Sequence, residues 1–268
     1  MTPLSHAEHG QAAYRIRFDW GLTGARAMVA DACSDDVAVV VDVLSFTTTL
    51  TVAVEQGIAV YPFPWAAAEA AAYAEQRGAV LARGRREGPG AGNPSLSPAS
   101  FAGLTGVERV VLPSPNGSTI AFALAEAGVT VVGACLRNAA EVGRRLAGLD
   151  RVSVVAAGER WPDGTLRPAV EDLWGAGAVL AALLGAVGTE GASPEAISAA
   201  AAYDRVRDHV ASAVLECASG RELVAAHFER DVEIAGVADV SRAVPTLRGE
   251  AFVGAGNVGA GNAAGQEG

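Results

Sequence analysis

Apolar runs of strand length alternate with amphipathic runs of helix length along most of the chain. The stretches "VAVVVDVL" (37–44) and "RVSVVAAG" (151–158) are continuous apolar runs, typical of strands that are covered on both faces of a sheet. "SFTTTLTVAVEQG" (45–57) begins with hydroxyl residues and ends at a glycine, as a capped helix does. We therefore expect strands at 13–21, 37–44, 58–63, 107–114, 129–136 and 151–158, and helices at 45–57, 65–78, 118–128, 138–148 and 169–188.

Strands that alternate with helices predict a three-layer α/β/α fold with a largely buried sheet. The helix at 169–188 is rich in small residues, which would let it pack closely against that sheet. From Ser193 through Cys217 the pattern turns helical, with a further helix at 219–228 and a short end at 244–253. The C-terminal part is therefore predicted to be mainly helical.

The length and composition indicate a globular chain. Half of its 268 residues are hydrophobic, and a chain of this length forms one large domain or two intimately packed halves. Residues 1–254 are accordingly assigned to a single α/β domain. Residues 255–268 are glycine-rich and have too little apolar surface to order themselves, so we expect a flexible tail.

The formal net charge of −10 argues against nucleic acid or an anionic membrane as a partner. An anionic ligand would need a local positive site. No segment offers about 18 consecutive apolar residues, and the first residues lack a basic-then-apolar signal pattern, which predicts a cytoplasmic protein. Assembly into a homo-oligomer stays open. Three widely spaced cysteines suggest small buried hydrophobes rather than a disulfide framework or a zinc site: Cys33, Cys135 and Cys217.

Two stretches of the chain resemble each other. When Thr48 is aligned with Thr119, "VVVDVLSFTTTLTVAVEQG" lies over "RVVLPSPNGSTIAFALAEAG", each a strand, a hydroxyl-rich turn, a helix and a closing glycine. Two turns of one kind suggest two half-sites that face a common cleft. The alternative is the general likeness of α/β units, and the sequence alone leaves both open.

Each of these turns is suited to bind an anion. The start of a helix presents unpaired backbone N–H groups, and the helix dipole adds partial positive charge. In "PNGST", Gly117 either lets the backbone approach an oxyanion closely or supplies a positive φ for the turn. An ordinary helix cap would look the same. The candidate phosphate-binding residues of the two turns are Ser45, Thr47, Thr48, Asn116, Gly117, Ser118 and Thr119.

Acidic residues follow several of the expected strands. Asp42 ends one apolar run and Glu159 follows another, while Glu171 and Asp172 begin a helix, where they could simply complement its dipole. Together the four carboxylates would make an oxygen-ligand set suited to Mg²⁺. The predicted metal ligands are Asp42, Glu159, Glu171 and Asp172, and the predicted catalytic residues are Asp42, Glu159, Arg137 and Asn138.

One familiar phosphatase mechanism does not fit the first block. Enzymes of the haloacid dehalogenase type begin with a strand that ends in Asp-x-Asp, whose second Asp is the general acid. Leu44 occupies that second place here. Histidines also lie away from the strand ends, which disfavours histidine-led catalysis.

The ordered blocks "DVLSFTTTLTVAVEQG", "GNPSLSP", "SPNGSTIAFALA", "CLRNAAEV", "AAGERWPDGTLRPAVEDLWGAG" and "ASGRELVAAHFERDVEIAGVADVSRAVP" resemble the 2-phosphosulfolactate phosphatase family, the ComB-like enzymes of coenzyme M biosynthesis. The resemblance runs from about Val37 to Pro245. It implies a Mg²⁺-dependent phosphatase with a three-layer α/β fold that acts on the phosphate ester of a small sulfonated hydroxy acid. The candidate site residues named above match the blocks by position.

Two departures concern the substrate. The family often carries Arg-Ala where this chain has Ser45 and Phe46, and Gly-Asn-Ser-Pro where this chain has "GNPS" (92–95). Loss of a cation beside the cleft would alter the anion accepted. For the reaction we prefer a metal-bound water as nucleophile, with Ser45 or Ser118 as the alternative. A non-catalytic module that binds a phosphorylated or acidic metabolite is the rival function.

Overall fold

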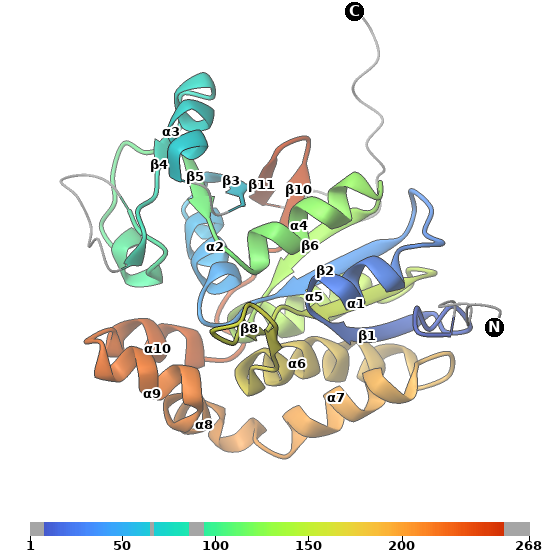
Figure 1. Cartoon of the computed structure of the whole chain (residues 1–268). Coiled ribbons are helices and arrows are strands. Elements are labelled where there is room, and N and C mark those ends of the chain that lie inside the picture. Colours follow the sequence, from blue (N-terminus) through green and yellow to red (C-terminus); the bar gives the residue numbers. More distant parts are fainter. Residues whose placement is uncertain (1–7, 65–66, 86–93, 255–268) are drawn as a thin grey trace, which may run out of the picture.

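The computed structural model of the protein describes residues 8–64, 67–85 and 94–254 (Figure 1). Its strands are β1 (Ile16–Trp20), β2 (Val37–Val41), β3 (Ala59–Phe63), β4 (Val80–Leu81), β5 (Arg109–Pro113), β6 (Thr130–Ala134), β7 (Val152–Ala156), β8 (Glu159–Arg160), β9 (Leu166–Arg167), β10 (Pro245–Arg248) and β11 (Ala251–Gly254). Its α-helices are α1 (Gly21–Met28), α2 (Phe46–Glu55), α3 (Ala67–Gln76), α4 (Gly117–Glu126), α5 (Ala139–Leu146), α6 (Val170–Val187), α7 (Pro194–Asp204), α8 (Val210–Glu216), α9 (Ala218–Ala225) and α10 (Glu229–Gly236). Short 3₁₀ helices are η2 (Pro98–Phe101), η3 (Leu136–Asn138) and η4 (Arg207–His209).

Within the described residues, nine strands form one mixed sheet in the order β1-β7-β2-β6-β10-β11-β3-β5-β4. Strands β1, β7, β2 and β6 are parallel to one another, and so are β3, β5 and β4. The antiparallel pair β10–β11 joins the two parallel groups. Helix α2 connects the first group to the second and α4 connects the second to the first, so each similar unit of the sequence starts in a different group.

The sheet is covered on both faces, as its continuous apolar strands predicted. Successive side chains of a strand point to opposite faces. Val37, Val39 and Val41 therefore join one hydrophobic core, which includes α5, α6 and α7, while Ala38 and Val40 join a second core, which includes α1, α2 and α4. The three-layer α/β fold expected from the sequence is confirmed.

Glycines allow α6 to pack unusually close to its neighbours. A Cβ atom at Gly175 would lie 2.6 Å from Val43, and one at Gly177 would lie 2.2 Å from the carbonyl oxygen of Ala199 on α7. By length and composition α6 is also apolar enough to cross a membrane, with a mean hydropathy of 1.5. Half of its residues are buried, and it packs against the sheet with α5 and α7 as its neighbours, as the core helix of a folded domain does.

Several local expectations differ from the structure. The sequence pattern gave no sign of α1, which begins at a glycine without a side-chain cap, nor of α10 or the β8–β9 hairpin. The helical stretch from Ser193 to Cys217 is divided into α7, η4 and α8. Cys33 is exposed, with its Sγ 3.3 Å from Asp36 Oδ1, so its predicted burial is wrong; Cys135 and Cys217 are buried. The predicted tail at 255–268 lies outside the described residues.

The close contact between α6 and α7 predicts that Gly177→Ala lowers the free energy of unfolding by about 1–3 kcal/mol, since the new methyl group meets a backbone oxygen. Gly185→Ala on the same helix is the matched control. Outside its own helix backbone, no atom of the described residues lies within 4 Å of its Cβ position, so the better helix propensity of alanine should leave stability unchanged or raise it by up to about 1 kcal/mol. Urea denaturation of both variants measures the difference. Equal effects at the two positions would contradict this close packing.

Candidate active site

Asp42 lies where the two similar units of the chain meet. It follows β2, and its buried carboxylate accepts two backbone hydrogen bonds. Phe46 N, in the first turn of α2, donates to Oδ1 at 3.1 Å, and Gly117 N, in the first turn of α4, donates to Oδ2 at 3.1 Å. Phe46 and Gly117 occupy equivalent positions when Thr48 is aligned with Thr119. The two turns therefore do face a common point, and the anion that both of them bind in this structure is the protein's own Asp42.

Gly117 is required for this close approach. It is absent from the glycines with positive φ, so the turn does not need a left-handed residue there. A Cβ atom at this position would instead lie 2.3 Å from the Phe46 ring and 2.8 Å from Asp42 Oδ2. The lack of a side chain lets the start of α4 reach the carboxylate.

A second buried carboxylate is held in the same way. Asp172, in the first turn of α6, accepts hydrogen bonds from Val43 N at 2.7 Å and from Gly158 N at 2.8 Å. It thereby ties the ends of β2 and β7 to α6. Glu171 beside it is also buried and lies near the Cys217 thiol, whose pKa burial and this carboxylate raise to about 12.

The acidic groups repel one another. Burial raises the pKa of Asp42 to about 6. Burial, followed by the negative charges of Asp42 and Glu171, raises the pKa of Glu159 to about 7. Burial and the same neighbours raise the pKa of Asp172 well above its usual range. The four carboxylates predicted from the sequence are thus close enough to form one electrostatic unit.

The negative charge of these four carboxylates suits a hard cation, but their side chains are not already arranged as a complete set of metal ligands. In the described parts of the chain, no three or more His, Cys, Asp or Glu side chains are placed to hold one metal ion together. Mg²⁺ is usually held by one or two carboxylates, with water and substrate phosphate completing its shell. Because the donors are oxygens and their mutual repulsion favours a bound cation, the site is compatible with Mg²⁺.

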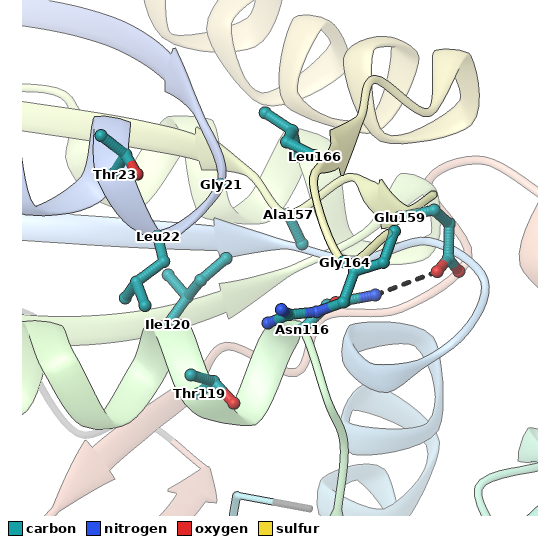
Figure 2. A pocket seen from close by; sticks show the side chains of 11 residues that line it. Gly21, Leu22, Thr23, Asn116, Thr119, Ile120, Ala157, Glu159, Gly164 and Leu166 are labelled. Atoms are coloured by element: carbon teal, nitrogen blue, oxygen red, sulfur yellow. Dashed lines mark hydrogen bonds between the residues drawn. The ribbon is translucent and has the colours of Figure 1, made fainter. Parts of the chain in front are cut away.

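A cavity of about 190 Å³ opens beside Glu159 (Figure 2). Its walls come from the first turns of α1 and α4, the end of β7 and the β8–β9 hairpin. Asn116, just before α4, donates from Nδ2 to Glu159 Oε2 at 3.0 Å, and both side chains line the cavity. The carboxylate unit is thus in direct contact with a space large enough for a small molecule.

The hydroxyl groups expected to bind phosphate mostly serve the backbone. The side chains of Thr47 and Thr48 donate to the carbonyl oxygens of Asp42 and Val43, both at 2.7 Å. Ser118 likewise donates to Leu112 O and Thr119 to Pro115 O, both at 3.0 Å. Because a hydroxyl has one proton to donate, these contacts favour a role in shaping the turns. Both candidate nucleophiles, Ser45 and Ser118, are buried, and the hydroxyl proton of Ser118 is already donated to Leu112 O, which disfavours Ser118.

Arg137 and Asn138 lie away from the carboxylates. Arg137 donates to Ile234 O at 3.1 Å and lies 3.6 Å from Glu55. Glu55 is the last residue of α2, whereas Asp42 contacts the first turn of this helix, roughly 13 Å away along its axis. Asn138 is fully buried, and its amide binds backbone groups of Cys135, Gly133 and Ala243. These contacts favour structural roles over the catalytic ones that we expected.

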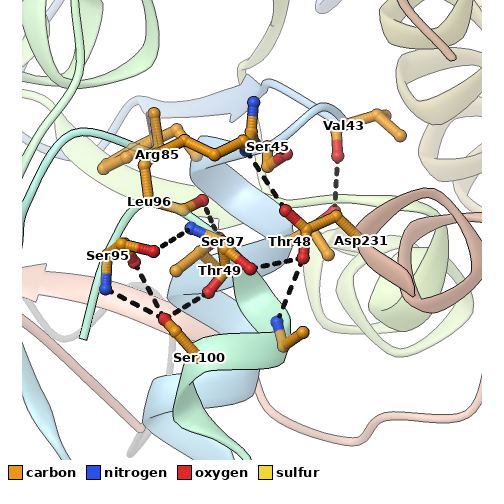
Figure 3. A network of polar contacts seen from close by, with 12 residues as sticks. Val43, Ser45, Thr48, Thr49, Arg85, Ser95, Leu96, Ser97, Ser100 and Asp231 are labelled. Atoms are coloured by element: carbon orange, nitrogen blue, oxygen red, sulfur yellow. Dashed lines mark hydrogen bonds and ion pairs between the residues drawn. The ribbon is translucent and has the colours of Figure 1, made fainter. Parts of the chain in front are cut away.

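Arg85 is a cation of the site that the sequence pattern does not mark. In the network of Figure 3 its Nη2 donates to Ser45 Oγ, and its Nε donates to Asp231 Oδ2 on α10 at 3.2 Å. Asp231 is buried and also accepts from Ser97 Oγ. The charge of Arg85 favours the ionised form of Asp42. A cation therefore lies beside Ser45 after all, but it comes from the loop after β4 and not from position 45, so the loss of a cation expected from the sequence is made up by Arg85.

The fold and the site define an α/β enzyme that places acidic groups and helix N-termini at the carboxyl ends of parallel strands, where such proteins act on small ligands. The sequence model of the family described as 2-phosphosulpholactate phosphatase matches residues 25–250, and the chain belongs to this family of phosphoric monoester hydrolases. The chain is also 32% identical over 228 residues to a protein of Deinococcus radiodurans named "Probable 2-phosphosulfolactate phosphatase", a match that covers 82% of this chain and 91% of that protein. The family resemblance inferred from the ordered blocks is confirmed.

The close approach at Gly117 predicts that Gly117→Ala reduces both stability and phosphatase activity, because the added methyl group must displace Phe46 or the Asp42 carboxylate. We expect a loss of about 1–3 kcal/mol in the free energy of unfolding. Thermal melting and the turnover per folded molecule are the two measurements. Wild-type values for both would show that the turn tolerates a side chain and that the contact is not tight.

The raised pKa of Glu159 predicts a pH dependence of stability. The native state holds the proton of Glu159 up to about pH 7, whereas an unfolded glutamate loses it near 4.5, so this group stabilises the fold below about pH 4.5 and the effect is lost as the pH rises through about 7. Glu159→Gln keeps an oxygen for Asn116 but cannot ionise. In EDTA, its urea midpoint should therefore fall less between pH 5 and pH 8 than that of the wild type. The exposed Glu222→Gln is the control and should keep the wild-type slope; a wild-type slope in Glu159→Gln would contradict the raised pKa.

Proposed function

We propose that this phosphatase hydrolyses the monoester 2-phosphosulfolactate to sulfolactate and phosphate and that it requires Mg²⁺. The name of the Deinococcus protein and of the family supports the substrate. The observation that supports the chemistry is the Asp42 carboxylate, bound by the first turns of two helices and surrounded by three further acidic groups next to a cavity. Few purely structural roles would explain so many carboxylates in one buried place.

Two carboxylates are the best candidates to hold Mg²⁺. Asp42 lies at the junction of the two turns, and Glu171 is buried near it. Backbone N–H groups bind both oxygens of Asp172, but none of the described residues donates one to Glu171. When bound, Mg²⁺ would neutralise charge on the phosphate oxygens as the ester bond breaks. Asp172 would then be a positioning residue that keeps the ends of β2 and β7 in place.

Glu159 is suited to move the proton. One of its oxygens is fixed by Asn116, and its pKa of about 7 is matched to proton transfer near neutral pH. In the proposed reaction, water attacks phosphorus and gives a proton to Glu159 Oε1, and the bond from phosphorus to the ester oxygen breaks. The same proton then passes to the leaving alkoxide, so ester and water give alcohol and phosphate.

The rival function is a non-catalytic module that binds an acidic metabolite. Such a module would use the helix N-termini and the cavity but would have no need for the carboxylate cluster. Because the chain belongs to a phosphatase family, we favour the enzyme over the non-catalytic module.

Phosphate release from 2-phosphosulfolactate, measured with Mg²⁺ and with EDTA, tests the proposal directly. We expect turnover that is lost in EDTA and restored by Mg²⁺. Asp42→Asn should lower activity at least a hundred-fold, and it should also melt earlier, because its amide NH₂ would face one of two backbone donors and leave that donor unpaired, at a cost of about 1–3 kcal/mol. The exposed Asp35→Asn is the control and should behave as wild type. Binding of the ester without turnover in either condition would favour the module instead.

A further inference from the structure

The β8–β9 hairpin presents different chemistry on its two faces. Glu159 pairs with Arg167 and Arg160 pairs with Leu166 across the two strands, and paired residues lie on the same face. The face with Arg160 and Leu166 covers the 190 Å³ cavity, where Leu166 also lies against the Gly21 backbone at the start of α1. The cavity therefore has a cationic wall, formed by Arg160, next to its apolar ones.

Arg160 is fixed in place but keeps free donors. Its Nε donates to Asn116 Oδ1 at 3.0 Å, and its Nη2 donates to Pro115 O at 3.2 Å. Nη1 has no hydrogen-bond partner among the described residues, although the side chain is exposed and lines the cavity. A guanidinium held in this way loses little conformational entropy when it binds an acid group. The same Asn116 side chain donates to Glu159, so a single amide links the Arg160 guanidinium to the four carboxylates.

The charges around the site make such a cation necessary for an acidic substrate. Asp42, Glu159, Glu171 and Asp172 would repel any acid group that accompanies the phosphate, and a metal would be directed at the phosphate itself. Arg85 is engaged by Ser45 and the buried Asp231, and Arg167 donates to Ser219. Arg160 is the guanidinium that lines the cavity next to Glu159.

We propose that the cavity is the subsite for the acid groups of the substrate other than the phosphate, and that Arg160 is the residue that binds them and selects for them. This inference rests on the proposed phosphatase function and adds a specificity-determining residue and subsite to the same site. The cavity, of about 190 Å³, is large enough for one such acid arm.

Three esters on one carbon skeleton test the proposal: 2-phosphosulfolactate, 2-phospholactate and glycerol 2-phosphate carry two, one and no extra acid groups. The measurement is the ratio of kcat/KM between each acid and glycerol 2-phosphate for the wild type, Arg160→Ala and Arg160→Lys. We expect Arg160→Ala to lower the ratio for 2-phosphosulfolactate about ten- to a hundred-fold, and Arg160→Lys to restore part of it. The loss for 2-phospholactate tells whether Arg160 contacts the carboxylate or mainly the sulfonate. Arg205→Ala, an exposed arginine of another surface, is the control.

Calorimetry with the products separates this inference from the function. Sulfolactate should bind the wild type at least ten-fold more tightly than it binds Arg160→Ala, whether or not any ester is hydrolysed. Turnover with unchanged ratios and unchanged sulfolactate binding would overturn the role of Arg160 while the phosphatase function stands. An equal loss for all three esters would show that Arg160 acts only by positioning Asn116 and Glu159, and would also overturn it. Absence of turnover with Arg160-dependent binding would overturn the function and support the subsite.

Discussion

The hydrogen bonds to the Asp42 carboxylate are the interaction on which the rest of the site depends. Its two oxygens accept from the first turns of α2 and α4, which start from the two parallel groups of the sheet. The hairpin β10–β11 pairs in register with each group at one residue, Thr246 with Val132 and Phe252 with Val60, and this carboxylate further connects the two groups at the functional edge. An acid buried in this way is costly unless its charge is satisfied, and two helix N-termini are a strong means of doing so.

That arrangement has an electrostatic consequence. The backbone donors favour the ionised form of Asp42, yet burial raises its pKa to about 6, because the desolvation of this carboxylate outweighs the two backbone hydrogen bonds and the charge of Arg85. The protein therefore holds negative charge in a place where that charge is unfavourable without a cation. An acidic chain with a net charge of −10 can bind an anionic ester only if positive groups are local. The charge of Arg85 acts on Asp42, and Arg160 lines the cavity next to Glu159.

The sequence could predict the layers and the acidic residues because both follow from short patterns. Continuous apolar strands need two covered faces, and Asp42 follows such a strand directly. It could not predict that the anion at "PNGST" is an aspartate 75 positions away, since that contact depends on the arrangement of the two parallel groups. The catalytic role predicted for Arg137 is disfavoured for a related reason. Arg137 follows a strand, but its contacts with Glu55 and Ile234 hold its side chain away from the carboxylates. Arg85 lies in a loop after β4, where no periodicity marks it.

The β8–β9 hairpin shows how two tasks are combined in a very short element. Because side chains alternate along a strand, Glu159 and Arg160 leave β8 on opposite faces, and yet both contact Asn116, through Nδ2 and Oδ1 of one amide. An amide presents a donor and an acceptor on one rigid group, so Asn116 can hold an acid and a base apart while it fixes both. A direct ion pair between the two would neutralise them and leave neither free. The asparagine before α4 thus allows Glu159, the proposed proton-transfer group, and Arg160, the proposed anion-binding group, to lie side by side in one cavity.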